Sequence, residues 1–378
     1  MLYRKYGSTE INVSALGMGG MRFRNQENVD ECASLVKAAY DGGINYFDTA
    51  SGYGKSEELF GAAFRDMLKT RREKPFYIAT KTFAESPEGV RKDIEISLSR
   101  LGLPSIDFYH VWCVLSWDKY LKRKTAGILK EFERLREEGL LRHICVSTHM
   151  KGEDIGRLLR DYPFDGVLLG YSVMNFAYRE KALEEAATLS RGVVVMNPLG
   201  GGLIPQNPEL FSFVKSRPDD TAVSGALRFL FNDKRISTAL VGISSKEELN
   251  EALRAVNGFQ ALPENEVARI RSELKDRFEG LCTNCRYCDK CPQGIPVPQF
   301  MESFNILKLK DNPKEAVGRL RWHWGHRLED RILDRCSNCG LCEEACTQKL
   351  PIRKRLEVLR AELEKTRVEE AEKKRNSQ

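Results

Sequence analysis

Eight of the eleven cysteines lie after residue 280, in two runs whose spacing suits the binding of a metal cluster. Three evenly spaced thiolates on one tight loop can hold three corners of a cube, and a fourth cysteine completes the set. The two runs therefore predict two [4Fe–4S] clusters, and zinc bound by four thiolates is the competing interpretation. The runs are Cys282-x2-Cys285-x2-Cys288-x2-Cys291 and Cys336-x2-Cys339-x2-Cys342-x3-Cys346.

The last cysteine of each run can serve the other cluster, as it does in bacterial two-cluster ferredoxins. By that analogy Cys346 completes the ligands of the first run, and Cys291 completes those of the second. Two departures leave this exchange open. The first run has two residues, not three, before its last cysteine, and Thr347 stands where a proline is usual.

A second set of chemically useful side chains lies in the N-terminal half of the chain. Asp48 ends one β-rich run, Tyr53 follows in the next loop, and Lys81 ends the next β-rich run. Where these three meet, the ammonium is expected to lower the pKa of the phenol while the carboxylate holds the lysine in place. Such a set suits giving a proton to a carbonyl oxygen while hydride arrives at its carbon. A turn cap for Asp48 and an ordinary ion pair for Lys81 are the structural alternatives.

The elements that must position these residues alternate between β-rich runs and amphipathic helical stretches from about residue 10 to residue 260. Eight such pairs favour a closed parallel (β/α)8 barrel, although the period alone leaves a doubly wound sheet open. Apolar runs such as residues 193–195 fit strands that are covered on both faces. The expected strands are Ser14–Gly17, Asn45–Thr49, Phe76–Lys81, Asp107–Cys113, His143–Ser147, Gly166–Tyr171, Gly192–Asn197 and Ser237–Gly242. The expected helices include Val29–Tyr40, Glu57–Leu68, Val90–Leu101, Ile128–Glu137 and Glu247–Val256 in the barrel, and Glu264–Phe278 after it.

This alternation ends near residue 262, which predicts three regions. Residues 1–262 form the barrel, residues 263–352 form a small, mostly helical ferredoxin-like domain, and residues 353–378 form a charged C-terminal helix or tail. Leu356, Leu359 and Leu363 share one face of that helix. An ordinary packed helix with a polar end is the favoured interpretation, and a coiled-coil partner helix is the alternative.

Composition excludes several other classes of protein. The 378 residues are 42% hydrophobic and 30% charged, with a net charge of +6, so we expect a folded chain that binds no nucleic acid. Without an apolar run of about 18 residues or a secretory signal, we expect a soluble, cytoplasmic protein without membrane contact. The scattered Cys32, Cys113 and Cys145 are expected to be small buried residues.

The run Asp48-Thr49-Ala50-x-x-Tyr53-Gly54-x-Ser56-Glu57, followed by Ala79-Thr80-Lys81, resembles the aldo/keto reductases. Segments 14–20 and 198–202 extend that resemblance over roughly residues 1–257. Cys291-Pro292-Gln293-Gly294-Ile295 is similar to a subset of the family with a ferredoxin-like iron–sulfur extension. The resemblance implies a TIM barrel and the nicotinamide-dependent reduction of an aldehyde or ketone, with Asp48, Tyr53 and Lys81 as catalytic residues.

The fourth catalytic residue of the family, a histidine, is replaced here by Trp112. The family pattern Asp-x-Tyr-x-x-His corresponds to residues 107–112, which contain a histidine only at His110. Strand side chains alternate, so His110 and Trp112 are expected to face the same way. We expect His110 to be an interior histidine with satisfied hydrogen bonds, and a role in the site is the alternative.

The resemblance also implies a site for NADH or NADPH, with the choice between them left open. Glu248 stands where many members have a basic residue, although Lys246 is close enough in sequence to offset it. Leu168 replaces the glutamine that commonly supports the nicotinamide amide. The implied cofactor-binding residues are Ser147, Met196, Pro198, Leu199, Gly200, Gly201, Gly202, Ser244, Lys246 and Glu251.

Together these features predict an oxidoreductase that reduces or oxidises a small carbonyl or alcohol. Nicotinamide transfers hydride whereas a cluster accepts one electron, so a ferredoxin or flavoprotein is the expected redox partner if the two exchange electrons. One alternative is an electron-transfer or interaction protein whose barrel has lost turnover, which Trp112 favours. The other is an enzyme with purely structural clusters.

Overall fold

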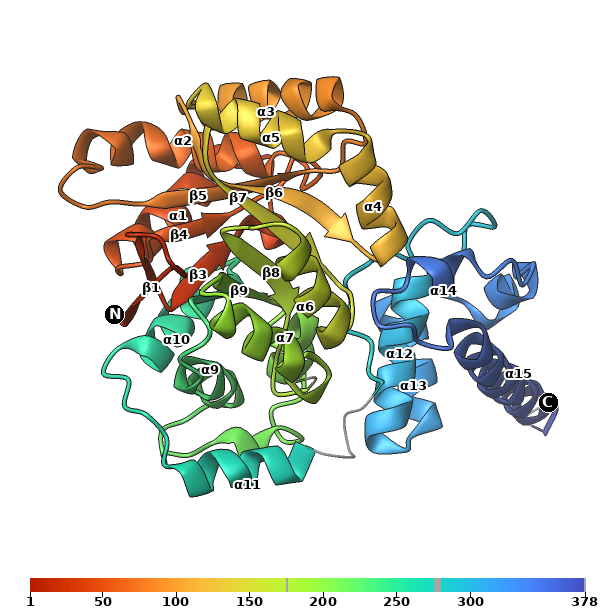
Figure 1. The fold of residues 1–378 in the computed structure, drawn as a ribbon. Coiled ribbons are helices and arrows are strands. Elements are labelled where there is room, and N and C mark those ends of the chain that lie inside the picture. Colours follow the sequence, from red (N-terminus) through yellow and green to blue (C-terminus); the bar gives the residue numbers. More distant parts are fainter. Residues whose placement is uncertain (175, 275–279, 377–378) are drawn as a thin grey trace. The chain divides into compact units, whose positions relative to one another are not determined.

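The computed structural model describes residues 1–174, 176–274 and 280–376 (Figure 1). The chain divides into two compact units, Met1–Glu273 and Leu274–Gln378. Among the helices of the described ranges, none combines the length and apolar character needed to span a bilayer.

Eight parallel strands close into a barrel in the first unit. Their order is β10-β3-β4-β5-β6-β7-β8-β9, so each strand pairs with the next along the chain and the last closes on the first. This confirms the predicted TIM barrel, and each of the eight predicted strands overlaps an observed one. The strands are β3 (Leu16–Gly19), β4 (Tyr46–Asp48), β5 (Tyr77–Thr82), β6 (Ile106–Val114), β7 (Leu141–Thr148), β8 (Gly166–Gly170), β9 (Gly192–Met196) and β10 (Thr238–Gly242).

Helices follow the strands around the barrel, and several begin at residues that the sequence marks as caps. Ser86 accepts the Gly89 amide ahead of Pro87, and Gly102 ends the same helix in the left-handed region. The predicted helix Glu264–Phe278 is observed over Glu264–Leu274, and its last residues lie outside the described ranges. The helices are α1 (Val29–Asp41), α2 (Ser56–Met67), α3 (Pro87–Leu101), α4 (Trp117–Thr125), α5 (Ile128–Glu137), α6 (Gly152–Asp161), α7 (Phe176–Thr188), α8 (Leu203–Gln206), α9 (Ala222–Asn232), α10 (Lys246–Val256) and α11 (Glu264–Leu274).

An N-terminal hairpin packs a tyrosine into the barrel core. Strands β1 (Tyr3–Lys5) and β2 (Asn12–Ser14) pair antiparallel, and Tyr6 follows β1 with no exposed surface. Its ring lies against the backbone of Gly166 and Gly192, where a Cβ atom on either residue would overlap it. The glycines that begin β8 and β9 thus make room for this ring.

The register of three neighbouring strands positions the polar residues of the barrel. Asp48 of β4 pairs with Ala79 of β5, and Lys81 of β5 pairs with His110 of β6. The β6–β7 register then shifts between Val111 and Val114, where Cys113 has a φ of 56°. A bulge of this kind redirects side chains at the end of a strand.

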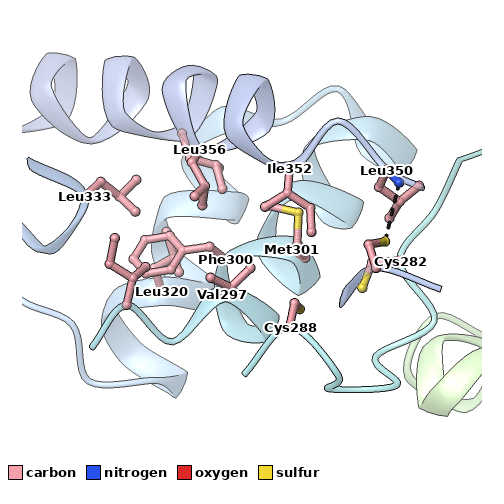
Figure 2. Packing of buried hydrophobic residues seen from close by; sticks show 13 residues of the cluster. Cys282, Cys288, Val297, Phe300, Met301, Leu320, Leu333, Leu350, Ile352 and Leu356 are labelled. Carbon is pink, nitrogen blue, oxygen red and sulfur yellow. Dashed lines mark hydrogen bonds between the residues drawn. The ribbon is translucent and has the colours of Figure 1, made fainter. Parts of the chain in front are cut away.

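The second unit has its own hydrophobic core, shown in Figure 2. Phe300, Met301 and Leu320 are buried in it, and Cys282 and Cys288 belong to the same cluster of buried residues. The unit contains α12 (Val297–Lys310), α13 (Pro313–Gly318), α14 (Leu341–Ala345) and α15 (Ile352–Asn376), with short turns at Arg319–His323, Leu328–Asp330 and Ile332–Arg335.

The C-terminal helix α15 packs on this core by one face. Leu356 and Leu359 are buried, and Leu363 is partly buried against the same cluster. The three leucines that share a helical face in the sequence are therefore used within their own unit. This confirms the packed-helix interpretation.

Candidate functional site

Asp48 and Lys81 form a buried ion pair at the carboxyl ends of β4 and β5. Lys81 Nζ lies 2.6 Å from Asp48 Oδ1 and donates a second hydrogen bond to the Thr49 carbonyl at 2.6 Å. Both side chains are almost fully buried. Burial raises the pKa of Asp48 and lowers the pKa of Lys81. The charge of Lys81 opposes the rise in the pKa of Asp48, and the charge of Asp48 opposes the fall in the pKa of Lys81. The pairing keeps two charges in a place where either alone would be costly.

Tyr53 lies beside this pair, in the loop that follows β4. Lys81 Nζ is 5.0 Å from the centre of the Tyr53 ring. The Trp112 ring meets Tyr53 edge to face at 5.4 Å and stacks on Phe83 at 3.7 Å. The structure thus brings together the predicted Asp48, Tyr53, Lys81 and Trp112 at one end of the barrel, where active sites of this fold occur.

The pKa of Tyr53 is raised, which corrects the expectation that Lys81 lowers it. Burial of the hydroxyl is the largest cause, Asp48 and Cys113 add to it, and Arg22 acts in the opposite direction. The side chain itself is only half-buried. Because Lys81 is already neutralised by Asp48, it provides little net charge to stabilise a phenolate. Tyr53 is therefore held as a neutral phenol.

His110 is fully buried beside Lys81, and the expected hydrogen bonds of its ring are not fully formed. Within the described ranges neither ring nitrogen has a well-formed hydrogen bond, although the Val146 backbone acts on the ring as a hydrogen-bonding group. Burial and the Lys81 charge lower the pKa of His110 to about 3. The imidazole is thus neutral at physiological pH, and Trp112 occupies the position nearer the mouth.

A pocket of about 520 Å³ opens beside the loops that follow β9 and β10. Of the residues implied as cofactor-binding, six line it, whereas Ser147, Met196, Gly200 and Lys246 do not. Ser147 is buried in β7, and Lys246 is exposed at the start of α10. The six lining residues are Pro198, Leu199, Gly201, Gly202, Ser244 and Glu251.

Two arginines that the sequence reasoning missed, Arg22 and Arg24, also line this pocket. Arg24 lies 3.7 Å from Glu248, which accepts hydrogen bonds from the Ser244 amide at 2.7 Å and its hydroxyl at 2.8 Å. The exposed Glu248 carboxylate is therefore held in place by Ser244 and faces the positive charge of Arg24. The position of Arg22 and Arg24 shortly after the first barrel strand was the sequence signal that could have identified them as pocket residues.

In the second unit, Cys346 joins the first cysteine run. The thiols of Cys282, Cys285 and Cys288 interact electrostatically with that of Cys346. Burial raises the pKa of Cys282 to about 12, because it disfavours a charged sulfur. Three buried or partly buried sulfurs and a fourth from the other run thus form one group.

Polar groups point at these sulfurs and fix their loops. The Asn284 amide lies 3.4 Å from Cys282 Sγ, the Thr347 hydroxyl 3.4 Å from Cys285 Sγ, and the Leu350 amide 3.4 Å from Cys346 Sγ. The dashed line in Figure 2 starts at the Leu350 amide nitrogen and marks the hydrogen bond that this amide donates. The hydroxyl of Thr347, at the position where proline is usual, is thereby available to a cysteine. Such hydrogen bonds suit sulfurs that carry negative charge in a cluster.

Asn305 of α12 holds the first run from the side. Its carboxamide accepts a hydrogen bond from the Cys282 amide at 2.8 Å and donates one to the Cys282 carbonyl at 2.7 Å. Asn284 and Asn338 occupy matching places in the two runs, with φ of 50° and 57°. The repeated Cys-x-Asn-Cys pattern was the sequence signal for these two turns, since asparagine tolerates the left-handed region.

The other four cysteines share a small cavity. Cys291 of the first run lines it together with Cys336, Cys339 and Cys342 of the second. Burial and Glu343 raise the pKa of Cys342 to about 11, and Cys339 is exposed. Within the part of the chain described, no group of three or more His, Cys, Asp or Glu side chains has the spacing of a single-ion site. The donor sets, two groups of four thiols with amides and a hydroxyl aimed at sulfur, fit iron–sulfur ligation.

Two family models match the chain. Residues 15–275 match the aldo/keto reductase family, and residues 281–351 match a 4Fe-4S dicluster domain. The second match covers all eight clustered cysteines. Together the two matches account for the barrel and for the cysteine-rich unit.

Individual relatives agree with this. The chain is 27% identical to L-galactose dehydrogenase of Arabidopsis thaliana over 289 residues, which cover 68% of this chain and 89% of that protein. It is 24% identical to the uncharacterized oxidoreductase YqkF of Bacillus subtilis over 314 residues, 73% of this chain and 97% of that protein. The holo form of aldo-keto reductase AKR11C1 from Bacillus halodurans shares the fold, with a TM-score of 0.59 at 22% identity, over 72% of this chain and 96% of that one. The chain belongs to the aldo/keto reductase family, and it is an oxidoreductase with a C-terminal 4Fe-4S domain.

Proposed function

We propose that the barrel reduces a small aldehyde or ketone, or oxidises the corresponding alcohol, with Tyr53 as the proton donor. The observation that carries the proposal is the buried Asp48–Lys81 pair beside the Tyr53 ring. A neutral phenol can give its proton to the more basic alkoxide oxygen that forms when a carbonyl receives hydride. The raised pKa of Tyr53 keeps that proton in place until the substrate takes it.

The other residues of the site act through position and exclusion of water. Lys81, fixed by Asp48 and the Thr49 carbonyl, packs against the Tyr53 ring and holds the phenol in position. Trp112 and Phe83 form an apolar wall beside Tyr53. This wall favours small substrates with an apolar part. Trp112 cannot donate a proton to the substrate as the family histidine can.

We assign the 520 Å³ pocket to NADH or NADPH. The glycines at 201 and 202 allow close approach to a pyrophosphate, and the arginines at 22 and 24 bring positive charge to the same pocket. When bound, nicotinamide supplies the hydride that the residues of this chain cannot supply. Arg22, Arg24, Ser244 and Glu251 would hold the dinucleotide, and Lys246 lies at the exposed start of the same helix.

We further propose that the second unit holds two [4Fe–4S] clusters with exchanged ligands. Cys282, Cys285 and Cys288 with Cys346 bind one cluster, and Cys336, Cys339 and Cys342 with Cys291 bind the other. The grouping of the thiols supports this assignment. The clusters supply one-electron transfer, so a ferredoxin or flavoprotein is the proposed redox partner.

A barrel without turnover is the second candidate, and the packing of Trp112 against Tyr53 favours it. Anaerobically purified protein should be assayed with NADH and NADPH against a set of small carbonyls. Turnover that Tyr53→Phe abolishes supports the enzyme. Nicotinamide binding without turnover of any carbonyl supports an electron-transfer role instead.

A further inference from the structure

Arg355 is a buried arginine in the second turn of α15, next to the first group of cysteines. Its side chain is only 7% exposed, and Nη2 donates to the Gly280 carbonyl at 2.6 Å. The guanidinium carbon lies 4.8 Å from the centre of the Phe304 ring. The guanidinium is thus fixed at Gly280, which lies two residues before Cys282, the start of the first cysteine run.

This arginine differs from its neighbours in lacking a carboxylate partner. Arg353 pairs with Glu343 at 2.8 Å, and Arg321 pairs with Glu370 at 2.6 Å. Among the residues that the structure describes, no carboxylate lies within ion-pair distance of Arg355, and its buried Nη1 has no hydrogen-bond partner. A buried guanidinium without a counter-charge is strongly unfavourable, so a negative group is expected beside it.

The available negative groups are cysteine sulfurs. Cys282 and Cys346 are the charges that favour the protonated guanidinium, and Arg355 in turn favours the thiolate of Cys282. A cluster held by four thiolates carries net negative charge, and that charge increases by one when it accepts an electron. A fixed positive charge stabilises the reduced form more than the oxidised form.

We propose that Arg355 is the counter-charge of the cluster held by Cys282, Cys285, Cys288 and Cys346, and that it raises this cluster's reduction potential above that of the other cluster. The inference rests on the ligand assignment proposed above. Arg355 is a positioning and tuning residue, because it acts on the cluster through its charge and ligates no iron.

The surroundings of the second group of cysteines differ in the direction that this proposal requires. The Glu343 carboxylate acts on Cys342, and a nearby negative charge disfavours the reduced form of a cluster. Arg353 lines the same cavity, but its charge is balanced by Glu343. The described residues that line this cavity therefore supply no unbalanced cation, and the cluster there is expected to be harder to reduce.

The test is a redox titration of the full chain with dithionite, followed by electron paramagnetic resonance. Dithionite supplies one electron per cluster, and no bond is made or broken. We expect two reduction steps in the wild type. Arg355→Gln should lower the higher step, so that the ratio of reduced to oxidised cluster at the wild-type midpoint falls at least about tenfold, or about 59 mV. Lys354→Gln is the matched control, because it removes the same charge from the exposed neighbouring residue.

Each outcome decides the proposal. Equal shifts in Arg355→Gln and Lys354→Gln overturn it, because the effect is then one of net charge alone. If Arg355→Gln loses the cluster, Arg355→Lys decides: the proposal requires it to keep the cluster with a reduced-to-oxidised ratio within about threefold of wild type. A tenfold fall in Arg355→Lys overturns the proposal. A wild-type protein without any cluster signal refutes the proposed cluster ligands. That result differs from equal shifts in the two glutamine variants and from a tenfold fall in Arg355→Lys, which concern Arg355 alone.

Discussion

The proton-donor role of Tyr53 leads to a prediction that can be worked through from the structure. Tyr53→Phe removes one oxygen atom and leaves a ring of the same shape. The ring should still pack edge to face on Trp112 and stay 5.0 Å from Lys81 Nζ. Tyr53 also lies outside the residues that line the 520 Å³ pocket. The substitution therefore changes the proton supply and little else.

The expected loss follows from what a positioned acid contributes. General acid catalysis typically accounts for about 10²- to 10⁴-fold in rate, which corresponds to about 3 to 5 kcal/mol in the barrier. We expect kcat for carbonyl reduction to fall by that factor, and the Kd for NAD(P)H to change by less than about twofold. Because burial raises the pKa of Tyr53, the wild type should not lose activity through ionisation of this phenol as pH rises from 6 to 10.

The assay is nicotinamide oxidation at saturating carbonyl, with a separate binding titration of the dinucleotide. Tyr162→Phe provides a matched control, because it removes a phenol that donates a hydrogen bond to Glu133 at the outside of the barrel. Unchanged kcat in Tyr53→Phe would refute the role of this residue. A parallel loss of cofactor affinity would show instead that the substitution disturbed the binding pocket.

Three further predictions follow from packing, ligation and titration. Gly166→Ala should cost about 1 to 3 kcal/mol of unfolding free energy in urea, because its Cβ overlaps the buried Tyr6 ring, whereas Gly170→Ala on the same strand meets nothing within 4 Å and should cost less. Cys339→Ala should release about half of the bound iron and its visible absorbance, and full iron retention would overturn this ligand assignment. The lowered pKa of His110 means that the unfolded chain binds more protons than the folded one between pH 3 and 6.5, so stability should rise with pH across that window. His110→Asn should make the unfolding free energy less dependent on pH between 4 and 7, and an unchanged dependence would contradict the burial of a neutral imidazole.

Much of the barrel could be predicted because its strands carry a local signal. Runs such as residues 193–195 are apolar throughout, since a parallel sheet is covered on both faces, and this pattern survives without knowledge of the fold. The same holds for the face of α15 that carries Leu356 and Leu359. The cofactor residues were harder: Arg22 and Arg24 follow a different strand from the loops that the resemblance implied, and only closure of the barrel brings them to Ser244 and Glu248.

The sequence by itself determined the chemistry of the two sets of residues, because residue type and short-range spacing are local properties. The Asp48, Tyr53 and Lys81 constellation and the two cysteine runs were therefore identifiable directly. Tertiary structure alone decided how these groups act on one another. It grouped Cys346 with the first run, held Tyr53 as a neutral phenol and left Arg355 without a carboxylate. Charge interactions and desolvation depend on distance through space and on burial, and neither is encoded by the spacing of residues along the chain.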